Sequence, residues 1–187
     1  MDKYNNYEYI ENFFDEKTSK YYFDEILKQV DFQQNTVTVF GKVYPEPRLT
    51  AIYGDDPNKS YTYSKSKRQI VKMPKVLEDI RNILKQQTGI HYDFILLNYY
   101  RDGNDKIGWH SDDEKEMNHT NIASISFGAT RKFKVRSSNT KEVLNTFELK
   151  DGSLFWMKDN FQEVYQHEVP KQANKGPRIN LTFRVFK

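Results

Sequence analysis

The sequence contains no cysteine among its 187 residues, so disulfides, thiolate-ligated zinc sites and cysteine nucleophiles are excluded. It also lacks any run of about 18 apolar residues, the length that a membrane-spanning helix requires. The first six residues, Met-Asp-Lys-Tyr-Asn-Asn, are acidic and polar and do not resemble a signal peptide. These absences lead us to expect a soluble intracellular protein with no membrane partner.

Aromatic residues, in contrast, are abundant. Tyrosine and phenylalanine occur 13 times each, and aromatic side chains make up 15% of the sequence. The mean hydropathy of −0.87 is polar, but a chain this rich in aromatic residues is not a disordered one. The length favours one domain with a full core. We therefore expect a single domain over residues 1–187, present as a monomer.

Basic residues gather in three parts of the sequence, although the net charge is only +3. Residues 57–77 hold six lysine and arginine residues and no acid, with Tyr61 and Tyr63 between them. Residues 131–136 and residues 171–187 are also basic and free of acids. Any one cluster could be a solvated surface, but basic stretches mixed with aromatic rings also suit the phosphates and bases of a nucleic acid. Three clusters in one small domain favour a polyanionic partner.

Hydrophobic periodicity predicts two helices and, after them, several short strands. The first helix is expected over residues 15–30, capped by Asp15. The second is expected over residues 74–87, between Pro74 and Gly89. Strands are expected over residues 36–40, 94–100, 121–127, 132–136, 153–157 and 178–186, whereas residues 49–70 look irregular or hairpin-like. This order favours an α+β, mainly β fold, namely a double-sheet jelly roll with supporting helices.

The candidate metal ligands are two histidines and one aspartate. His110 and Asp112 are two residues apart in Gly108-Trp109-His110-Ser111-Asp112-Asp113-Glu114, so at a strand end their side chains would point the same way. His167 lies far downstream. Two imidazoles and one carboxylate can bind one face of Fe(II) and leave the opposite face open for a co-substrate and O₂. Taken alone, the spacing of the first two residues more often marks a surface histidine beside an acidic patch.

A row of polar residues near the end of the sequence fits a keto-acid co-substrate. An iron oxygenase needs a two-electron reductant, and a dicarboxylic keto acid bound through two metal positions would supply it. The outer carboxylate then requires a fixed, bidentate cation, which is arginine rather than lysine. Residues 178–186 alternate polar and apolar, so four polar side chains share one face of a strand: Arg178, Asn180, Thr182 and Arg184. Asn98 and Tyr100, two residues apart on another expected strand, can add two hydrogen bonds.

Further motifs accompany these residues in a fixed order. They are Asn98-Tyr99-Tyr100-Arg101-Asp102-Gly103, Ile107 to Glu114, Ile122 to Arg131, Gly152-Ser153-Leu154, His167 and Arg178 to Arg184, preceded by Pro47 to Asp55 and Tyr61 to Ser64. In this order and spacing the sequence resembles the AlkB-like Fe(II)/2-oxoglutarate dioxygenases. The resemblance covers roughly residues 36–187, and so many ordered motifs are far more specific than the histidine–aspartate spacing alone.

The resemblance implies a fold and a set of ligands. The fold is a double-stranded β-helix, a jelly-roll variant, over residues 93–187, preceded by an extension over residues 1–92 that holds supporting helices and a nucleotide-recognition region. Fe(II) would be bound by His110, Asp112 and His167. The co-substrate 2-oxoglutarate would be held by Asn98, Tyr100, Arg178, Asn180, Thr182 and Arg184, and O₂ would be the second co-substrate.

The resemblance also implies a pocket for a flipped base. Tyr61 and Glu114 would hydrogen-bond the base, and Tyr63 would stack on it opposite His110. Ordinary packing within a hairpin is the alternative for the two tyrosines.

Two further residues are expected to contact the nucleic acid. Phe40, in Val39-Phe40-Gly41-Lys42, resembles the hydrophobic finger of duplex-acting AlkB homologues, which inserts into the stack in place of the flipped base. Arg131 would contact phosphate or shape the rim of the pocket. The alternatives are a strand-end core position for Phe40 and a solvated strand position for Arg131.

The implied reaction is hydroxylation of an N-alkyl group on a base of the 1-methyladenine or 3-methylcytosine type, with release of formaldehyde, succinate and CO₂. The implied role is direct-reversal DNA repair, with duplex DNA as the expected partner and single-stranded DNA as a variant. The alternatives are an RNA demethylase of the same mechanism, a nucleic-acid-binding module on an inactive scaffold, and a hydroxylase of proteins or small molecules. The chain keeps every expected metal and keto-acid residue, which disfavours the inactive module.

Overall fold

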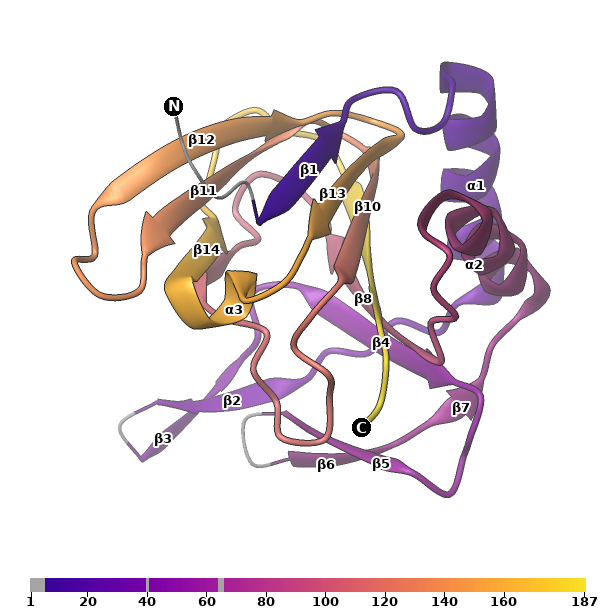
Figure 1. The fold of residues 1–187 in the computed structure, drawn as a ribbon, viewed down its shortest axis with the longest axis horizontal. Coiled ribbons are helices and arrows are strands. Elements are labelled where there is room, and N and C mark those ends of the chain that lie inside the picture. Colours follow the sequence, from indigo (N-terminus) through magenta and orange to yellow (C-terminus); the bar gives the residue numbers. More distant parts are fainter. Residues whose placement is uncertain (1–5, 40, 64–65) are drawn as a thin grey trace.

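The computed structural model describes residues 6–39, 41–63 and 66–187, and these residues form three helices and fifteen strands (Figure 1). The helices are α1 (Glu16–Gln29), α2 (Lys75–Thr88) and α3 (Phe161–Val164). The strands are β1 (Tyr7–Ile10), β2 (Thr36–Val39), β3 (Lys42–Pro45), β4 (Leu49–Gly54), β5 (Ser60–Tyr63), β6 (Ser66–Gln69), β7 (Val71–Lys72), β8 (Phe94–Tyr100), β9 (Ile107–His110), β10 (Ile122–Gly128), β11 (Arg131–Ser137), β12 (Val143–Leu149), β13 (Ser153–Met157), β14 (Tyr165–Val169) and β15 (Arg178–Arg184).

Two sheets face each other and form the body of the domain. The larger sheet has the strand order β1-β13-β10-β15-β8-β4-β7, and the smaller sheet has the order β12-β11-β14-β9. The short hairpins β2-β3 and β5-β6 belong to neither sheet. The smaller sheet lies on one side of the larger one, and α1 and α2 lie on the other (Figure 1). This arrangement confirms the expected fold class, a mainly β jelly roll with supporting helices.

Both long helices form where the sequence pattern predicts them. Asp15 caps α1 by accepting a hydrogen bond from the backbone N–H of Thr18 at 2.7 Å. Gly89 ends α2 in the left-handed conformation, with a φ of 75°. Tyr22 and Ile26 of α1 are buried with the apolar side of α2 in one core against the larger sheet. Among the described residues, no helix is both long enough and apolar enough to cross a bilayer.

Strand β15 separates the helix-side core from the space between the sheets. It pairs with β10 on one side and with β8 on the other. Ile179, Leu181 and Phe183 are fully buried in the core beneath the helices. The four polar residues that alternate with them line a pocket between the sheets. The expected alternation is therefore confirmed, and the strand ends at Arg184.

The expectation that residues 49–70 are irregular is wrong for their first part. Leu49–Gly54 forms β4, which pairs with β8 over its whole length. Five of its six residues are buried, so the segment lacks the alternation of polar and apolar residues that marks a half-buried strand. The later part is the hairpin β5-β6, as expected. Strands β1, β4 and β7 precede residue 92, where the boundary between the extension and the core was expected. They belong to the same sheet as four strands that follow residue 92.

The turn before β13 packs closely against the segment that leads into α1. Gly152 has a φ of 71°, and its carbonyl oxygen accepts a hydrogen bond from the backbone N–H of Phe14 at 2.9 Å. A Cβ atom at this position would lie 2.4 Å from the carbonyl oxygen of Phe14 and 2.3 Å from Oγ of Ser19. Glycine therefore satisfies both the backbone conformation and the space at this junction.

We expect Gly152→Ala to lower the free energy of unfolding by about 3 kcal/mol, because backbone strain and overpacking add. Gly89→Ala is the matched control. Gly89 has a similar φ of 75°, but no described atom lies within 4 Å of its Cβ position, so the change should cost only about 1 kcal/mol. Urea unfolding followed by circular dichroism measures both losses. Equal losses would contradict the close approach at Gly152.

Candidate active site

Three side chains that can bind a metal meet between the two sheets. His110 ends β9, His167 lies in β14, and cross-strand pairing places these residues opposite each other. Asp112 follows close behind, and one ligand atom from each of the three residues lies within 4.8 Å of the other two. The Nε2 atoms of His110 and His167 are 3.6 and 3.8 Å from carboxylate oxygens of Asp112. Two imidazoles and one carboxylate in this arrangement fit the facial site of Fe(II) oxygenases.

Both imidazoles are prepared to bind a metal as neutral ligands. Nδ1 of His110 donates to the carbonyl oxygen of Gly108 at 2.7 Å, which leaves Nε2 without a proton and facing Asp112. Burial lowers the pKa of His110. Burial, together with the neighbouring His110 and Arg184, lowers the pKa of His167 well below its usual value. A metal ion therefore displaces no proton from either ring at neutral pH.

Arg184, the last residue of β15, holds the carboxylate of Asp112. Its Nη2 lies 2.8 Å from Oδ1 of Asp112, and its Nη1 contacts Oε2 of Glu114. Burial alone would lower the pKa of Arg184, but the two carboxylates raise it above its usual value. Glu114 also accepts a hydrogen bond from the hydroxyl group of Tyr61 on β5 at 2.5 Å. A continuous chain of polar contacts therefore runs from a candidate metal ligand to the hairpin β5-β6.

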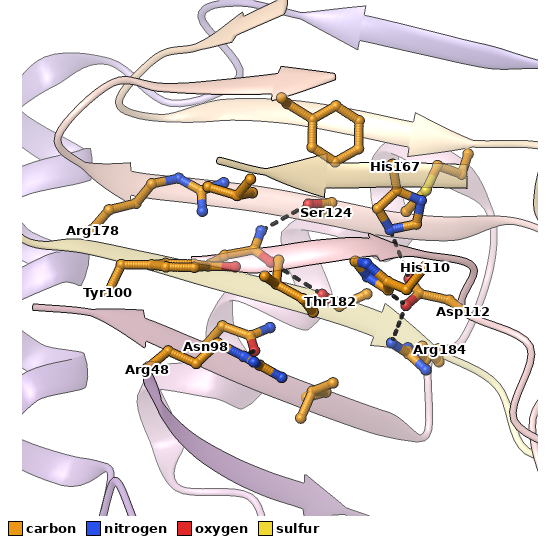
Figure 2. Close-up of a pocket in the computed structure, with 16 residues that line it drawn as sticks. Arg48, Asn98, Tyr100, His110, Asp112, Ser124, His167, Arg178, Thr182 and Arg184 are labelled. Carbon is orange, nitrogen blue, oxygen red and sulfur yellow. Dashed lines mark hydrogen bonds and ion pairs between the residues drawn. The ribbon is translucent and has the colours of Figure 1, made fainter. Parts of the chain in front are cut away.

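The opposite end of the pocket carries a buried cation with unused donors (Figure 2). Arg178 is 1% exposed, and its Nη2 donates to Oγ of Ser126 at 2.9 Å. Its Nε and Nη1 have no hydrogen-bond partner among the residues that the structure describes. The guanidinium lies 5.2 Å from the centroid of the Tyr100 ring. Burial lowers the pKa of Arg178 to about 10, so it remains charged at neutral pH and fits an incoming carboxylate.

The structure brings the other residues expected to hold the keto acid into the same pocket: Asn98, Tyr100, Asn180 and Thr182. The Asn180 amide is already engaged within the protein. Its Nδ2 donates to Oγ of Ser124 and to the carbonyl oxygen of Ile125, and its Oδ1 accepts from Thr182. Asn180 therefore braces β15 against β10 as well as lining the pocket. Direct contact of these residues with a keto acid stays a prediction.

Two residues of the site were not anticipated from the sequence. Arg48 is 3% exposed, lines the pocket and donates from Nε to Oδ1 of Asn98 at 2.6 Å. Gln162 of α3 accepts a hydrogen bond from the backbone N–H of Asp112 at 2.9 Å. Arg48 could have been found from the sequence, because a charged residue directly before the mostly buried strand β4 stands out. Gln162 could not, since a single glutamine on a four-residue helix has no distinguishing pattern.

Of the residues expected to bind a base, Tyr61 and Glu114 meet beside the metal cluster. Tyr63 lies on the same strand, but only its backbone is described, and Phe40 lies outside the described residues. The stacking role of Tyr63 and the finger role of Phe40 therefore stay predictions.

Arg131 does not lie where a phosphate contact would lie. Its side chain is 0% exposed. Its Nη1 and Nη2 donate to the carbonyl oxygens of Asp102, Asp105 and Pro170 at 3.1, 2.8 and 2.7 Å. The expectation that Arg131 contacts phosphate or the pocket rim is therefore wrong, because the guanidinium is enclosed and its donors are used inside the protein.

We expect His167→Ala to weaken the binding of Co(II), used as a stand-in for Fe(II), by at least about 100-fold, because one of three ligands is lost. His91→Ala is the matched control. His91 contacts Asp55 at the surface, outside the cluster, so its loss should leave the Co(II) affinity unchanged. Visible absorbance titration measures the affinity, and circular dichroism checks that both variants fold. Similar Co(II) affinities in the two variants would contradict the assigned metal site.

Comparisons with known proteins agree with this geometry. A family model described as the 2OG-Fe(II) oxygenase superfamily matches residues 6–184. "Alpha-ketoglutarate-dependent dioxygenase alkB homolog 3" of Homo sapiens is 35% identical, over 92% of this chain and 63% of the relative. "DNA oxidative demethylase ALKBH2" is 37% identical in Homo sapiens, over 87% of this chain and 66% of the relative. The form in Mus musculus is 36% identical, over 87% and 72%.

The solved structure titled "The structure of OsALKBH1" has the same fold, with a TM-score of 0.68 over 98% of this chain and 100% of the other. Its identity of 17% supports the fold alone. The chain spans a little under two thirds of the length of the first relatives that it matches. Fe(II), 2-oxoglutarate and O₂ are the cofactor and co-substrates of the matched family, and the cluster of His110, Asp112 and His167 fits the metal. The chain belongs to the 2OG-Fe(II) oxygenase superfamily, as an AlkB-like member.

Proposed function

We propose that this chain oxidatively removes alkyl groups from N-alkylated bases of DNA, of the 1-methyladenine or 3-methylcytosine type. The contact between Tyr61 on the hairpin β5-β6 and Glu114 beside the metal cluster carries the proposal. A base held by that hairpin would lie next to the reacting centre. The relatives described as DNA oxidative demethylases support DNA as the substrate.

The two ends of the pocket would bind different groups. His110, Asp112 and His167 would hold Fe(II), and Arg178 with Tyr100 would bind the outer carboxylate of 2-oxoglutarate. When bound, Fe(II) and 2-oxoglutarate activate O₂ to hydroxylate the N-alkyl carbon, after which the alkyl group leaves as an aldehyde. The chain supplies position and charge, since the walls between the sheets are buried and Arg184 fixes the carboxylate of Asp112.

A base must leave the stack to reach a pocket between two sheets, which costs a few kcal/mol. Tyr61 and Glu114 offer a hydroxyl donor and a carboxylate acceptor side by side for the polar edge of that base. Burial raises the pKa of Tyr61 well above its usual value, so the hydroxyl group keeps its proton. We propose that Tyr63 stacks on the flipped base. We also propose that Phe40 fills the gap that the base leaves in the stack of a duplex.

We expect Tyr61→Phe to lower kcat/KM on a methylated oligonucleotide about tenfold, which corresponds to about 1.4 kcal/mol for a hydrogen bond to a charged group. The Kd for 2-oxoglutarate should not change. Tyr92→Phe is the matched control, because Tyr92 is also fully buried but belongs to the helix-side core. An equal loss of kcat/KM in both variants would argue against a role for Tyr61 in handling the base.

The proposal is tested by incubating the protein with matched duplex DNA, single-stranded DNA and RNA that carry one methylated adenine. Formaldehyde and succinate are measured. We expect release of both with duplex DNA, at a rate at least equal to that with single strands. Release from methylated RNA and none from duplex DNA would reject the DNA assignment in favour of an RNA demethylase. Absence of a charge-transfer band after anaerobic addition of Fe(II) and 2-oxoglutarate would indicate an inactive nucleic-acid-binding module.

A further inference from the structure

Arg131 is a buried cation with no ion-pair partner among the described residues. It begins β11 and is 0% exposed. Its hydrogen bonds all go to neutral oxygens, namely those of Asp102, Asp105, Pro170 and Gln172. The carboxylate of Asp105 is hydrogen-bonded by Arg101 and acts on Arg131 only through the longer-range electrostatic interaction. Burial lowers the pKa of Arg131, and the nearby Tyr100, Asp105 and Asp102 offset this effect only in part, so the guanidinium is costly to keep in the protein interior.

The ring of Tyr100 is close to both Arg131 and Arg178. The two guanidinium carbons are 5.5 and 5.2 Å from the centroid of the Tyr100 ring. Tyr100 and Arg178 line the pocket, whereas Arg131 is not among the described residues that line it. Figure 2 shows Arg178 and Tyr100 at the end of the pocket away from the metal ligands. Two positive charges therefore converge on the end that would receive the outer carboxylate.

Arg131 also joins two loops that lead to the metal ligands. Asp102 and Asp105 lie in the loop from Tyr100 to β9, the strand that ends at His110. Pro170 follows β14, the strand that carries His167. The two loops also touch directly, since the backbone N–H of Gln172 donates to the carbonyl oxygen of Gly103. One guanidinium thus fixes the far ends of both metal-bearing strands.

We propose that Arg131 is a positioning and charge-balancing residue for the outer carboxylate of 2-oxoglutarate, acting through Tyr100. The positive charge of Arg131 already acts on Arg178, so an anion bound by Arg178 would also be attracted to Arg131 in an interior that screens charge weakly. The carboxylate of the co-substrate would then offset the repulsion between the two guanidiniums. The proposal concerns binding of 2-oxoglutarate and does not depend on which nucleic acid is the substrate.

A clamp that acts only through hydrogen bonds would need the shape of Arg131 but not its charge. Two keto acids distinguish the two roles. 2-Oxoglutarate has the outer carboxylate, and 2-oxopentanoate has the same carbon chain with a methyl group in its place. Loss of the charge of Arg131 should raise Kd for 2-oxoglutarate but not for 2-oxopentanoate. A distorted pocket should raise Kd for both keto acids.

The experiment measures Kd for both keto acids on the Fe(II)-loaded protein without O₂, from the charge-transfer absorbance. We expect Arg131→Gln to raise Kd for 2-oxoglutarate about tenfold and Kd for 2-oxopentanoate about twofold or less. Lys132→Gln is the matched control, because it removes one positive charge from the next, exposed position of β11. It should change neither Kd.

Arg131→Lys supplies the second test, because it keeps the charge and loses the fork of donors. We expect the ratio of the two Kd values to stay near that of the unmodified protein in this variant, even where the melting temperature falls. Equal weakening of both keto acids in Arg131→Gln, or an unchanged Kd for 2-oxoglutarate, would overturn the proposal. A clear change in the ratio of the two Kd values in Arg131→Lys would also overturn the proposal. If Arg131→Gln does not fold, the result for Arg131→Lys alone tests the proposal.

Discussion

The ion pair between Arg184 and Asp112 is the constraint on which the rest of the site depends. Asp112 lies just beyond β9, in a segment without regular secondary structure. Arg184 ends β15, which is paired on both sides at the middle of the larger sheet. Their 2.8 Å contact therefore ties a carboxylate on a loop to the central strand of the larger sheet. Because these groups are buried, loss of Arg184 would leave the carboxylates of Asp112 and Glu114 without their shared cation.

Strand β15 also sets opposite charges at the two ends of the pocket. At the end of Arg184, two carboxylates and one guanidinium leave an excess of negative charge beside two neutral imidazoles, which suits a divalent cation. At the end of Arg178, two guanidiniums approach the ring of Tyr100, which suits a carboxylate. Once a divalent cation is bound at the first end, this polarity would favour a molecule that has a metal-binding keto acid at one end and a carboxylate at the other.

Sequence pattern predicted those parts of the site that depend on local geometry. The polar face of β15 follows from alternation along one strand, whereas the pairing that brings His110 to His167 joins distant segments and has no local signature. Strand β4 escaped prediction because it is buried on both faces. Arg131 is in phase with Phe133 and Val135, which are both buried, so the alternation of β11 already pointed it inward. The prediction of a phosphate contact treated Arg131 as part of the basic cluster of residues 131–136 and overlooked this alternation.

The contacts of Glu114 link recognition of the base to the metal cluster through charge. Glu114 contacts Tyr61 on one side and Arg184 on the other, so a base that contacts Tyr61 and Glu114 would leave the ion pair with Arg184 intact. Fe(II) and the metal-bound carboxylate of 2-oxoglutarate would together add one positive charge at this end, while the outer carboxylate would lie at the end of Arg178. A base alkylated at a ring nitrogen of the proposed type is cationic, whereas the undamaged base is neutral. On the proposed function, the carboxylate of Glu114 beside Tyr61 would favour the cationic, damaged base by charge, before any contact with the alkyl group.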